Sequence, residues 1–292
     1  MRHFRERQRR RPGTEPRLIA ASKISAVKLM HDTAMPETEM PERPPPAAPI
    51  LNLAGYRFVA LADPAGWRDR VRNEAASRQL KGTVLLAGEG INFCIAGAED
   101  AARSFVAWLA SHAEFTGLTA KDSWSSQIPF QRLKVKVKPE IIRMNHPQVQ
   151  PQAERAPSVD ATTLARWLDT GIDDAGREVV TLDTRNAFEV DHGRFRGAYD
   201  WRIASFGEFP RALQAHRDEL AGKTVVSYCT GGIRCEKAAL LMAEAGVDHV
   251  LQLEGGILKY FEETDGRHFE GHCFVFDERG MLNDTLGEVP PV

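Results

Sequence analysis

Two things are scarce in this sequence of 292 residues: long apolar runs and cysteine. Its apolar stretches, such as AALLMA at residues 238–243, fall far short of the roughly 18 residues that a membrane-spanning helix requires. We therefore expect no membrane span. The 42% of hydrophobic and 27% of charged residues are typical of a globular protein, and the length favours two domains over one.

Cysteine occurs only at Cys94, Cys229, Cys235 and Cys273. So few cysteines in so long a chain exclude a dense disulfide framework, and the first residues lack the apolar core of a secretory signal peptide. Both features indicate a reducing, cytoplasmic compartment. There a cysteine is a catalytic, redox-active or buried thiol rather than a structural cross-link.

A strong net charge is also absent. The chain carries −2, but residues 1–48 hold ten Lys/Arg against six Asp/Glu, so the remainder is mildly acidic. A nucleic-acid partner would need a local basic patch. The arginine-rich start and proline-rich finish of residues 1–48 show no apolar period, which predicts a disordered tail. The alternative for this segment is a basic arm that touches RNA.

Residues 49–146 follow the pattern of a ferredoxin-like α+β domain. Strand patterns and helix patterns alternate in the order βαββαβ, which defines that plan. The predicted strands cover residues 51–61, 83–87, 91–97 and 118–124, and the predicted helices cover 64–80 and 98–113.

A basic stripe comes next, in the run RLKVKVKPEII at residues 132–142. Its alternation places Lys134, Lys136 and Lys138 on one side of an extended segment and apolar residues on the other. The stripe is either an RNA-backbone contact or a charged edge that discourages aggregation. The proline-bearing residues 147–157 then predict an inter-domain linker.

Residues 158–276 alternate between strands and helices. Apolar runs at 178–185 and 223–229 are separated by helical patterns, which indicates a parallel sheet covered on both faces. We expect an α/β domain here, followed by a C-terminal tail at 277–292.

The run CTGGIRC, which begins at Cys229, joins a buried strand to a helix. Open α/β sheets bind ligands at the carboxyl ends of their strands. Gly231 and Gly232 allow a tight turn whose N–H groups, with the positive end of the helix, form an anion-binding nest. Such surroundings lower the pKa of a thiol, so we expect a reactive Cys229 thiolate. Arg234 either closes the loop by bonding its carbonyls or holds an anionic group.

With LDTRNAFEVDHGRFRGA at residues 182–198 and LEGGILKYFEE at 253–263, CTGGIRC resembles a rhodanese domain. In that family the first loop cysteine carries a persulfide or acts as nucleophile, which maps onto Cys229. Asp183 and Arg185 match the structural D-x-R of the family. Glu189 matches the loop that follows. The other residues of the loop, which we expect to form the anion-binding nest, are Thr230, Gly231, Gly232 and Ile233.

Both halves read together are similar to the tRNA uridine(34) hydroxylase family. The resemblance rests on GTVLLAGEGINFCIAG, RLKVKVKPEII, CTGGIRCEKA, LEGGILKY and GHCFVFDERG in that order. It implies oxygen-dependent formation of 5-hydroxyuridine at the wobble position of tRNA. Two features differ from many members: Phe93-Cys94 alters the turn after Glu89, and no cysteine-rich extension follows residue 280.

The resemblance implies molecular oxygen as co-substrate. No nucleotide-binding fingerprint and no clustered metal ligands occur, so we predict no resident cofactor or metal, and no pattern indicates the electron donor. Cys235 is either a resolving thiol for Cys229 or a small buried helix residue. The expected partner is the anticodon loop of tRNA. Candidate RNA contacts are Lys134, Lys136, Lys138, Arg143 and Trp124, the last more readily explained as a core or interface residue.

Two other functions fit the same loop. A sulfurtransferase would carry sulfur on Cys229 as a persulfide, and a binding module would use the loop to hold an anion or a partner protein. The modification found on tRNA distinguishes the first from a hydroxylase, and the intact Cys229 and Arg234 argue against the second.

Overall fold

The computed structural model describes residues 49–289. The predicted N-terminal tail, residues 1–48, lies outside this range, as do the last three residues. Within the described range, no helix has both the length and the apolar character to cross a membrane.

The N-terminal domain has the predicted ferredoxin-like plan with one additional strand. Its sheet has the order β4-β1-β3-β2-β5, in which neighbouring strands are antiparallel except for the parallel pair β2 and β5. The elements are β1 (Ile50–Phe58), α1 (Pro64–Ser77), β2 (Lys81–Ala87), β3 (Gly90–Gly97), α2 (Glu99–Ala110), β4 (Ala120–Ser125) and β5 (Leu133–Val137).

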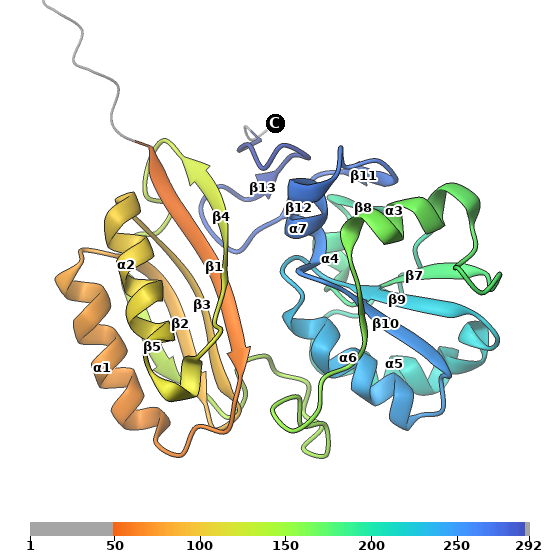
Figure 1. Cartoon of the computed structure of the whole chain (residues 1–292), viewed down its shortest axis with the longest axis horizontal. Helices are drawn as coiled ribbons and strands as arrows, with labels where there is room; N and C mark the ends of the chain where they lie inside the picture. Colours follow the sequence, from red (N-terminus) through yellow and green to blue (C-terminus); the bar gives the residue numbers. More distant parts are fainter. Residues whose placement is uncertain (1–48, 290–292) are drawn as a thin grey trace, which may run out of the picture. The chain divides into compact units, whose positions relative to one another are not determined.

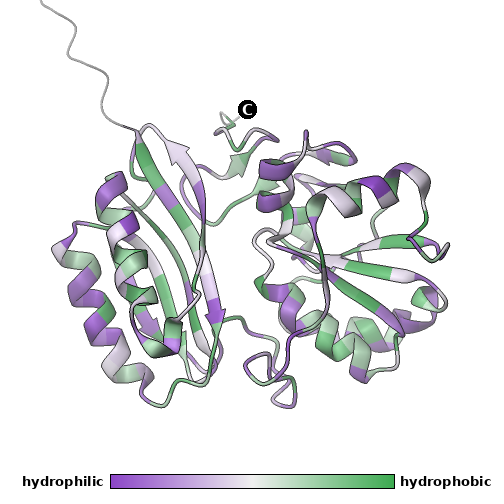
Figure 2. Cartoon of the chain, viewed as in Figure 1, coloured by the Kyte–Doolittle hydropathy of each residue, from purple (hydrophilic) through white to green (hydrophobic). Residues whose placement is uncertain are grey.

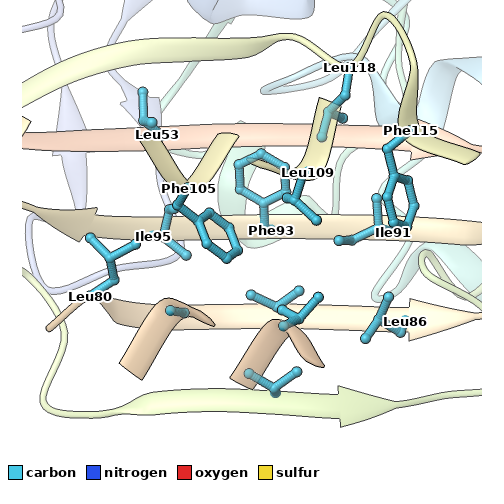
Figure 3. Close-up of a cluster of buried hydrophobic side chains, with 14 of the residues drawn as sticks. Leu53, Leu80, Leu86, Ile91, Phe93, Ile95, Phe105, Leu109, Phe115 and Leu118 are labelled. Carbon is cyan, nitrogen blue, oxygen red and sulfur yellow. The ribbon is translucent and has the colours of Figure 1, made fainter. Parts of the chain in front are cut away.

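Helices α1 and α2 cover one face of this sheet (Figure 1). Strand residues at alternate positions point toward the helices and form the core. Phe105 and Leu109 of α2 pack near Phe93 of β3 (Figure 3), and the two phenylalanine rings meet edge to face with centroids 6.4 Å apart. The helices leave the opposite face of the sheet for other contacts.

Polar side chains occupy that opposite face. Register pairs Lys121 of β4 with Ala54, Ala54 with Cys94, Cys94 with Thr83, and Thr83 with Lys134 of β5. Paired residues project to the same side of a sheet. Lys121, Cys94 and Lys134 therefore share the face that the helices leave uncovered.

The second domain contains the expected parallel sheet, in the order β6-β10-β9-β7. Strands β7 and β9 are buried along their whole length, as their apolar runs predict, and Figure 2 shows the apolar colour over parts of these strands. The strands are β6 (Ser158–Val159), β7 (Val179–Asp183), β8 (Gly193–Phe195), β9 (Thr224–Tyr228), β10 (His249–Leu253), β11 (Phe269–Gly271), β12 (Cys273–Phe274) and β13 (Met281–Leu282).

Helices lie between these strands along the chain. The fold class predicted from the sequence, a ferredoxin-like α+β domain followed by a rhodanese-like α/β domain, is confirmed. The helices are α3 (Ala161–Thr170), α4 (Ala187–Val190), α5 (Phe209–His216), α6 (Ile233–Glu244) and α7 (Gly256–Glu263).

Two segments expected to be a linker and a tail are packed against the fold. Val149 and Ala156, in the segment 147–157, are buried in the core of the second domain. In the segment after residue 277, strand β13 pairs with β12 and buries Leu282 completely. Arg279 binds Asp277 and donates a 2.8 Å hydrogen bond to Ser123 of the N-terminal domain. The described part of the predicted tail thus connects the two domains, because its apolar and charged residues have partners in both.

Candidate active site

The loop that carries Cys229 follows the last residue of β9 and ends where α6 begins. Gly232 has φ of +96°, a conformation that glycine adopts without strain, and its N–H donates to the Cys229 sulfur at 3.1 Å. Gly231 has no atoms around the position where a side chain would begin. The loop therefore turns toward the sulfur while leaving open space above it.

The start of α7 holds the other side of the loop. Ile257 N–H donates to the Cys229 carbonyl at 2.9 Å, and Leu258 N–H donates to the Thr230 carbonyl at 3.1 Å. A Cβ on Gly256 would lie 2.4 Å from the Cys229 carbonyl oxygen, so this position admits only glycine. The GGIL motif thus serves as the clamp on the cysteine loop.

Hydrogen-bond donors and a positive charge surround the Cys229 thiol. Burial by itself would raise its pKa, but a hydrogen bond from Cys235, the Arg234 charge, and N–H groups of Arg234 and Gly232 outweigh burial and lower the pKa to about 5. The sulfur is shielded from bulk solvent, yet Cys229 lines a cavity. It is therefore surrounded by hydrogen-bond donors rather than sealed in hydrocarbon.

Cys235 is the proton-bearing neighbour of this thiolate. It is fully buried, and burial together with the hydrogen bond to Cys229 raises its pKa well above the usual range. Its sulfur lies 3.8 Å from the Thr184 hydroxyl. All four cysteines are free thiols in the structure. These contacts agree with the buried-helix reading of Cys235, and its role as a resolving thiol stays a prediction.

Arg234 binds an anionic side chain of the protein itself rather than the loop carbonyls. Its guanidinium makes a two-pronged ion pair with Glu189 of α4, at 2.6 and 2.7 Å, with both side chains almost completely buried. Both terminal nitrogens donate to this carboxylate, and among the described residues no loop carbonyl accepts from Arg234. Because Arg234 also lines the cavity, its role in holding a substrate anion stays a prediction. Arg234 acts on the site through its charge, which stabilises the neighbouring thiolate.

The D-x-R pair is structural, as the resemblance implies. Arg185 and Asp183 form a fully buried ion pair at 2.6 Å, and Arg185 also donates to the Gly193 carbonyl at 2.6 Å. The pair fixes the chain after β7 to the start of β8. Neither side chain lines the cavity at Cys229.

A cavity of about 580 Å³ lies over the cysteine loop. One wall comes from the loop itself, through Cys229, Thr230, Gly231, Ile233 and Arg234. The other wall is the uncovered face of the N-terminal sheet, and the segment after β12 closes one side. A volume of this size matches the range of small-molecule sites in proteins.

The sheet wall contributes three residues that the sequence analysis did not propose as site residues. The Tyr56 hydroxyl donates to Glu236 at 3.2 Å, and burial raises the pKa of Tyr56 well above its usual range. Lys121 lines the same cavity, where burial lowers its pKa and the Cys229 thiolate opposes that change. Among residues 49–289, no hydrogen bond or ion pair engages the Lys121 ammonium group. Cys94 also lines the cavity, and burial raises the pKa of this thiol to about 11.

Buried charges of α6 fasten the second domain to the first. Lys237 binds Glu89 at 2.8 Å and Glu140 at 2.7 Å, and donates to the Ile142 carbonyl at 3.0 Å. Glu89 also accepts from the Ile141 N–H at 2.7 Å. The turn that begins at Glu89 therefore orients the segment leading into the second domain. Of the two residues that differ from many family members, Phe93 packs in the core of the N-terminal domain and Cys94 lines the cavity.

The predicted RNA contacts separate into two groups. Arg143 lines the cavity, while Lys134, Lys136 and Lys138 are exposed on or beside β5. Trp124 pairs with Leu51 on the helix-covered face of the sheet, away from the cavity, but it is 39% exposed, so it is not a core residue. In the described part of the chain, no group of three or more His, Cys, Asp or Glu side chains is placed to hold a metal ion.

Comparisons with known proteins agree with this architecture. Residues 50–141 match the UPF0176 acylphosphatase-like domain, and residues 164–263 match the rhodanese-like domain. A solved rhodanese-like domain from Anabaena is 23% identical, covers 39% of this chain and 79% of its own length, and has a TM-score of 0.33.

Similar sequences extend across both domains. The tRNA uridine(34) hydroxylase of Bordetella pertussis is 62% identical over 237 residues, which is 81% of this chain and 97% of the relative. The protein of the same name from Variovorax paradoxus is also 62% identical, over 81% of this chain and 90% of its own length. The chain therefore belongs to the tRNA uridine(34) hydroxylase family.

Proposed function

We propose that this protein is an oxidoreductase that hydroxylates C5 of uridine 34 in tRNA, with molecular oxygen as co-substrate. The observation that carries the proposal is the Cys229 sulfur, which accepts from the Gly232 N–H and lines a cavity of about 580 Å³ in a member of this family. Enzymes that modify a base extrude it into a closed pocket. The site would accept the uracil of a splayed anticodon loop, in a cytoplasmic protein.

The chemistry begins with addition of sulfur to the base. The Cys229 thiolate forms a bond to C6 of uracil, and the electron pair of the C5=C6 double bond moves to give an enolate at O4. C5 becomes electron-rich as a result. Hydroxylation replaces the C5 hydrogen, and loss of Cys229 restores the double bond. The second oxygen atom of O2 leaves as water with two electrons and two protons from a donor.

Lys121 is the side chain that would stabilise the enolate in this scheme. It lines the same cavity as Cys229, its side chain is half-buried, and its ammonium group has no acidic partner among the described residues. A cation held in a water-poor site stabilises negative charge that develops during reaction far better than it does in water. We assign Lys121 the role of binding the developing O4 charge.

The test is nucleoside mass spectrometry of tRNA from cells that lack this gene and carry a plasmid copy. The wild-type gene should restore 5-hydroxyuridine, and Cys229→Ser should abolish it. Cys94→Ser is the matched control, because it changes a thiol on the same cavity that burial keeps protonated. Full restoration by Cys229→Ser would refute the proposal. Thiolated uridine in place of 5-hydroxyuridine would assign the protein to the sulfurtransferases.

A further inference from the structure

A cluster of aromatic side chains stands at the edge of the cavity. Phe276 is 60% exposed and Phe188 is 44% exposed, values that are unusual for phenylalanine in a packed domain. Phe276 also lines the cavity that contains Cys229. We name Phe188, His192, Phe274 and Phe276 the aromatic cluster. Exposed apolar surface of this kind marks a binding site.

The rings of the cluster pack against one another although two of them are exposed. The Phe276 ring meets Phe274 edge to face at 5.2 Å and Phe188 edge to face at 6.2 Å. Phe188 meets Phe274 in the same way at 5.2 Å, and His192 stacks on Phe274 at 5.6 Å. Perpendicular neighbours hold an aromatic ring in one orientation. A ligand that stacks on Phe276 therefore meets a ring already in place.

The cluster comes from two segments of the second domain that the chain brings together. Phe188 lies on the short helix α4, and Phe274 and Phe276 lie in and after β12. The same segment continues into Asp277 and Arg279, whose ion pair is buried and anchored to Ser123 of the N-terminal sheet. Phe276 is thus tied to both walls of the cavity, although its own ring is exposed.

We propose that the aromatic cluster is a stacking platform for a nucleobase that neighbours the target uridine in the anticodon loop. This inference rests on the proposed function, because the covalent backbone delivers the neighbouring nucleotides to the cavity mouth whenever the uracil occupies the cavity. Single-stranded RNA is recognised mainly by stacking splayed bases on aromatic side chains. Phe276 offers such a surface and has continuity with the reaction site.

The experiment measures binding of an anticodon stem-loop RNA to the Cys229→Ser protein, which cannot turn the RNA over. Phe276→Ala should weaken binding by about ten-fold or more, the typical effect of removing one stacked base. Phe276→Trp should retain affinity because it keeps an aromatic face, whereas Phe276→Leu should not. Ile172→Ala is the control, since Ile172 is 46% exposed and does not line the cavity.

The same measurement with RNA lacking one base identifies the ligand. Two RNAs are compared with the intact one: the first lacks the base on the 5′ side of the target uridine, and the second lacks the base on the 3′ side. The RNA that lacks the stacked base should bind the Cys229→Ser protein more weakly than intact RNA does. The same RNA should bind the Phe276→Ala variant of that protein as tightly as intact RNA does, because the stacking surface is already gone. If Phe276→Ala leaves affinity unchanged, or if Phe276→Leu binds as tightly as the parent, the platform is refuted. Because wild-type protein would still form 5-hydroxyuridine in that case, this failure is distinct from failure of the proposed function.

Discussion

The two walls of the cavity shift the pKa of a cysteine thiol in opposite directions. On the loop wall, donors around Cys229 lower the thiol pKa to about 5. On the sheet wall, burial in β3 raises the pKa of Cys94 to about 11. Loop backbone at the start of a helix has free N–H groups to give, whereas the N–H groups of a strand are committed to the sheet. Position in the fold, rather than residue type, decides which cysteine is reactive.

The sheet wall also places a cationic side chain, Lys121, at the cavity. Lys121 of β4 lies on the same face of the sheet as Cys94 of β3. Ala54 of β1 lies between them and pairs with both. A thiolate on one wall and an ammonium group on the other are suited to a ring that gains a bond at one end and negative charge at the other. The division of charge between the two walls is thus a specific hypothesis about the reaction.

After the loss of Cys229 itself, the largest effect is expected at Lys121. Lys121→Met should lower the rate of 5-hydroxyuridine formation by about 100- to 1000-fold, the usual loss when one stabilising donor is removed from an active site. Lys121→Arg, which keeps the charge, should recover part of the rate. Single-turnover kinetics with saturating tRNA separates this effect from weaker binding.

A second readout isolates the addition step. In heavy water without oxygen, reversible addition of Cys229 should exchange the C5 hydrogen of uridine 34 for deuterium, because the enolate takes up a deuteron at C5. Lys121→Met should slow the exchange in proportion to the hydroxylation rate. Equal exchange rates in the variant and the wild-type protein would remove Lys121 from this role.

Local chemistry explains what the sequence could predict. The loop that holds Cys229 is built from consecutive residues, so its glycines and the helix that follows predict a low pKa without knowledge of the rest of the fold. Short apolar strand patterns predict β1 to β4, and continuous apolar runs predict the buried parallel strands β7 and β9 for the same reason. Both features depend on residues close together in the chain.

Partners distant in the chain were beyond such reasoning. Glu189 reaches Arg234 across 45 positions, and Arg279 reaches Ser123 across 156. The role of Lys121 depends on how two domains meet, which no periodicity encodes. Residues 277–289 have no strong strand pattern and still pack, because Leu282 is buried and Arg279 binds Asp277 and the distant Ser123.

The contrast between the two thiols can be measured directly by alkylation. At pH 6 Cys229 is mostly ionised and Cys94 is almost entirely protonated, but a thiolate of lower pKa is intrinsically less nucleophilic. Combining both effects, iodoacetamide should modify Cys229 about 100-fold faster than Cys94, as followed by peptide mass spectrometry. The Cys229 rate should stay constant from pH 8 to 6 and fall as the pH drops through about 5.

The shared cavity provides the control for access. Both thiols line it, so a difference caused by access alone would not change with pH. If the Cys229 rate instead climbs steadily between pH 7 and 9, the thiol has an ordinary pKa and the electrostatic account of the loop is wrong.

The smallest effect is expected at the edge of the sheet wall. Lys134 and Lys136 of β5 are exposed and project to the same face as Lys121, which makes this face a candidate path for the tRNA backbone into the cavity. Lys134→Glu combined with Lys136→Glu should weaken tRNA binding by about ten-fold at moderate salt, and should lessen the salt dependence of binding because fewer counterions are released.

The matched control reverses two charges on the opposite side of the same domain. Arg68 and Arg72 lie on α1, which covers the other face of the sheet, and both are partly exposed. Arg68→Glu combined with Arg72→Glu changes the net charge by the same amount, so a long-range effect of charge would appear in both double variants. If the two double variants bind tRNA equally weakly, the β5 lysines do not contact the tRNA backbone, and the path for tRNA along this face of the sheet is refuted.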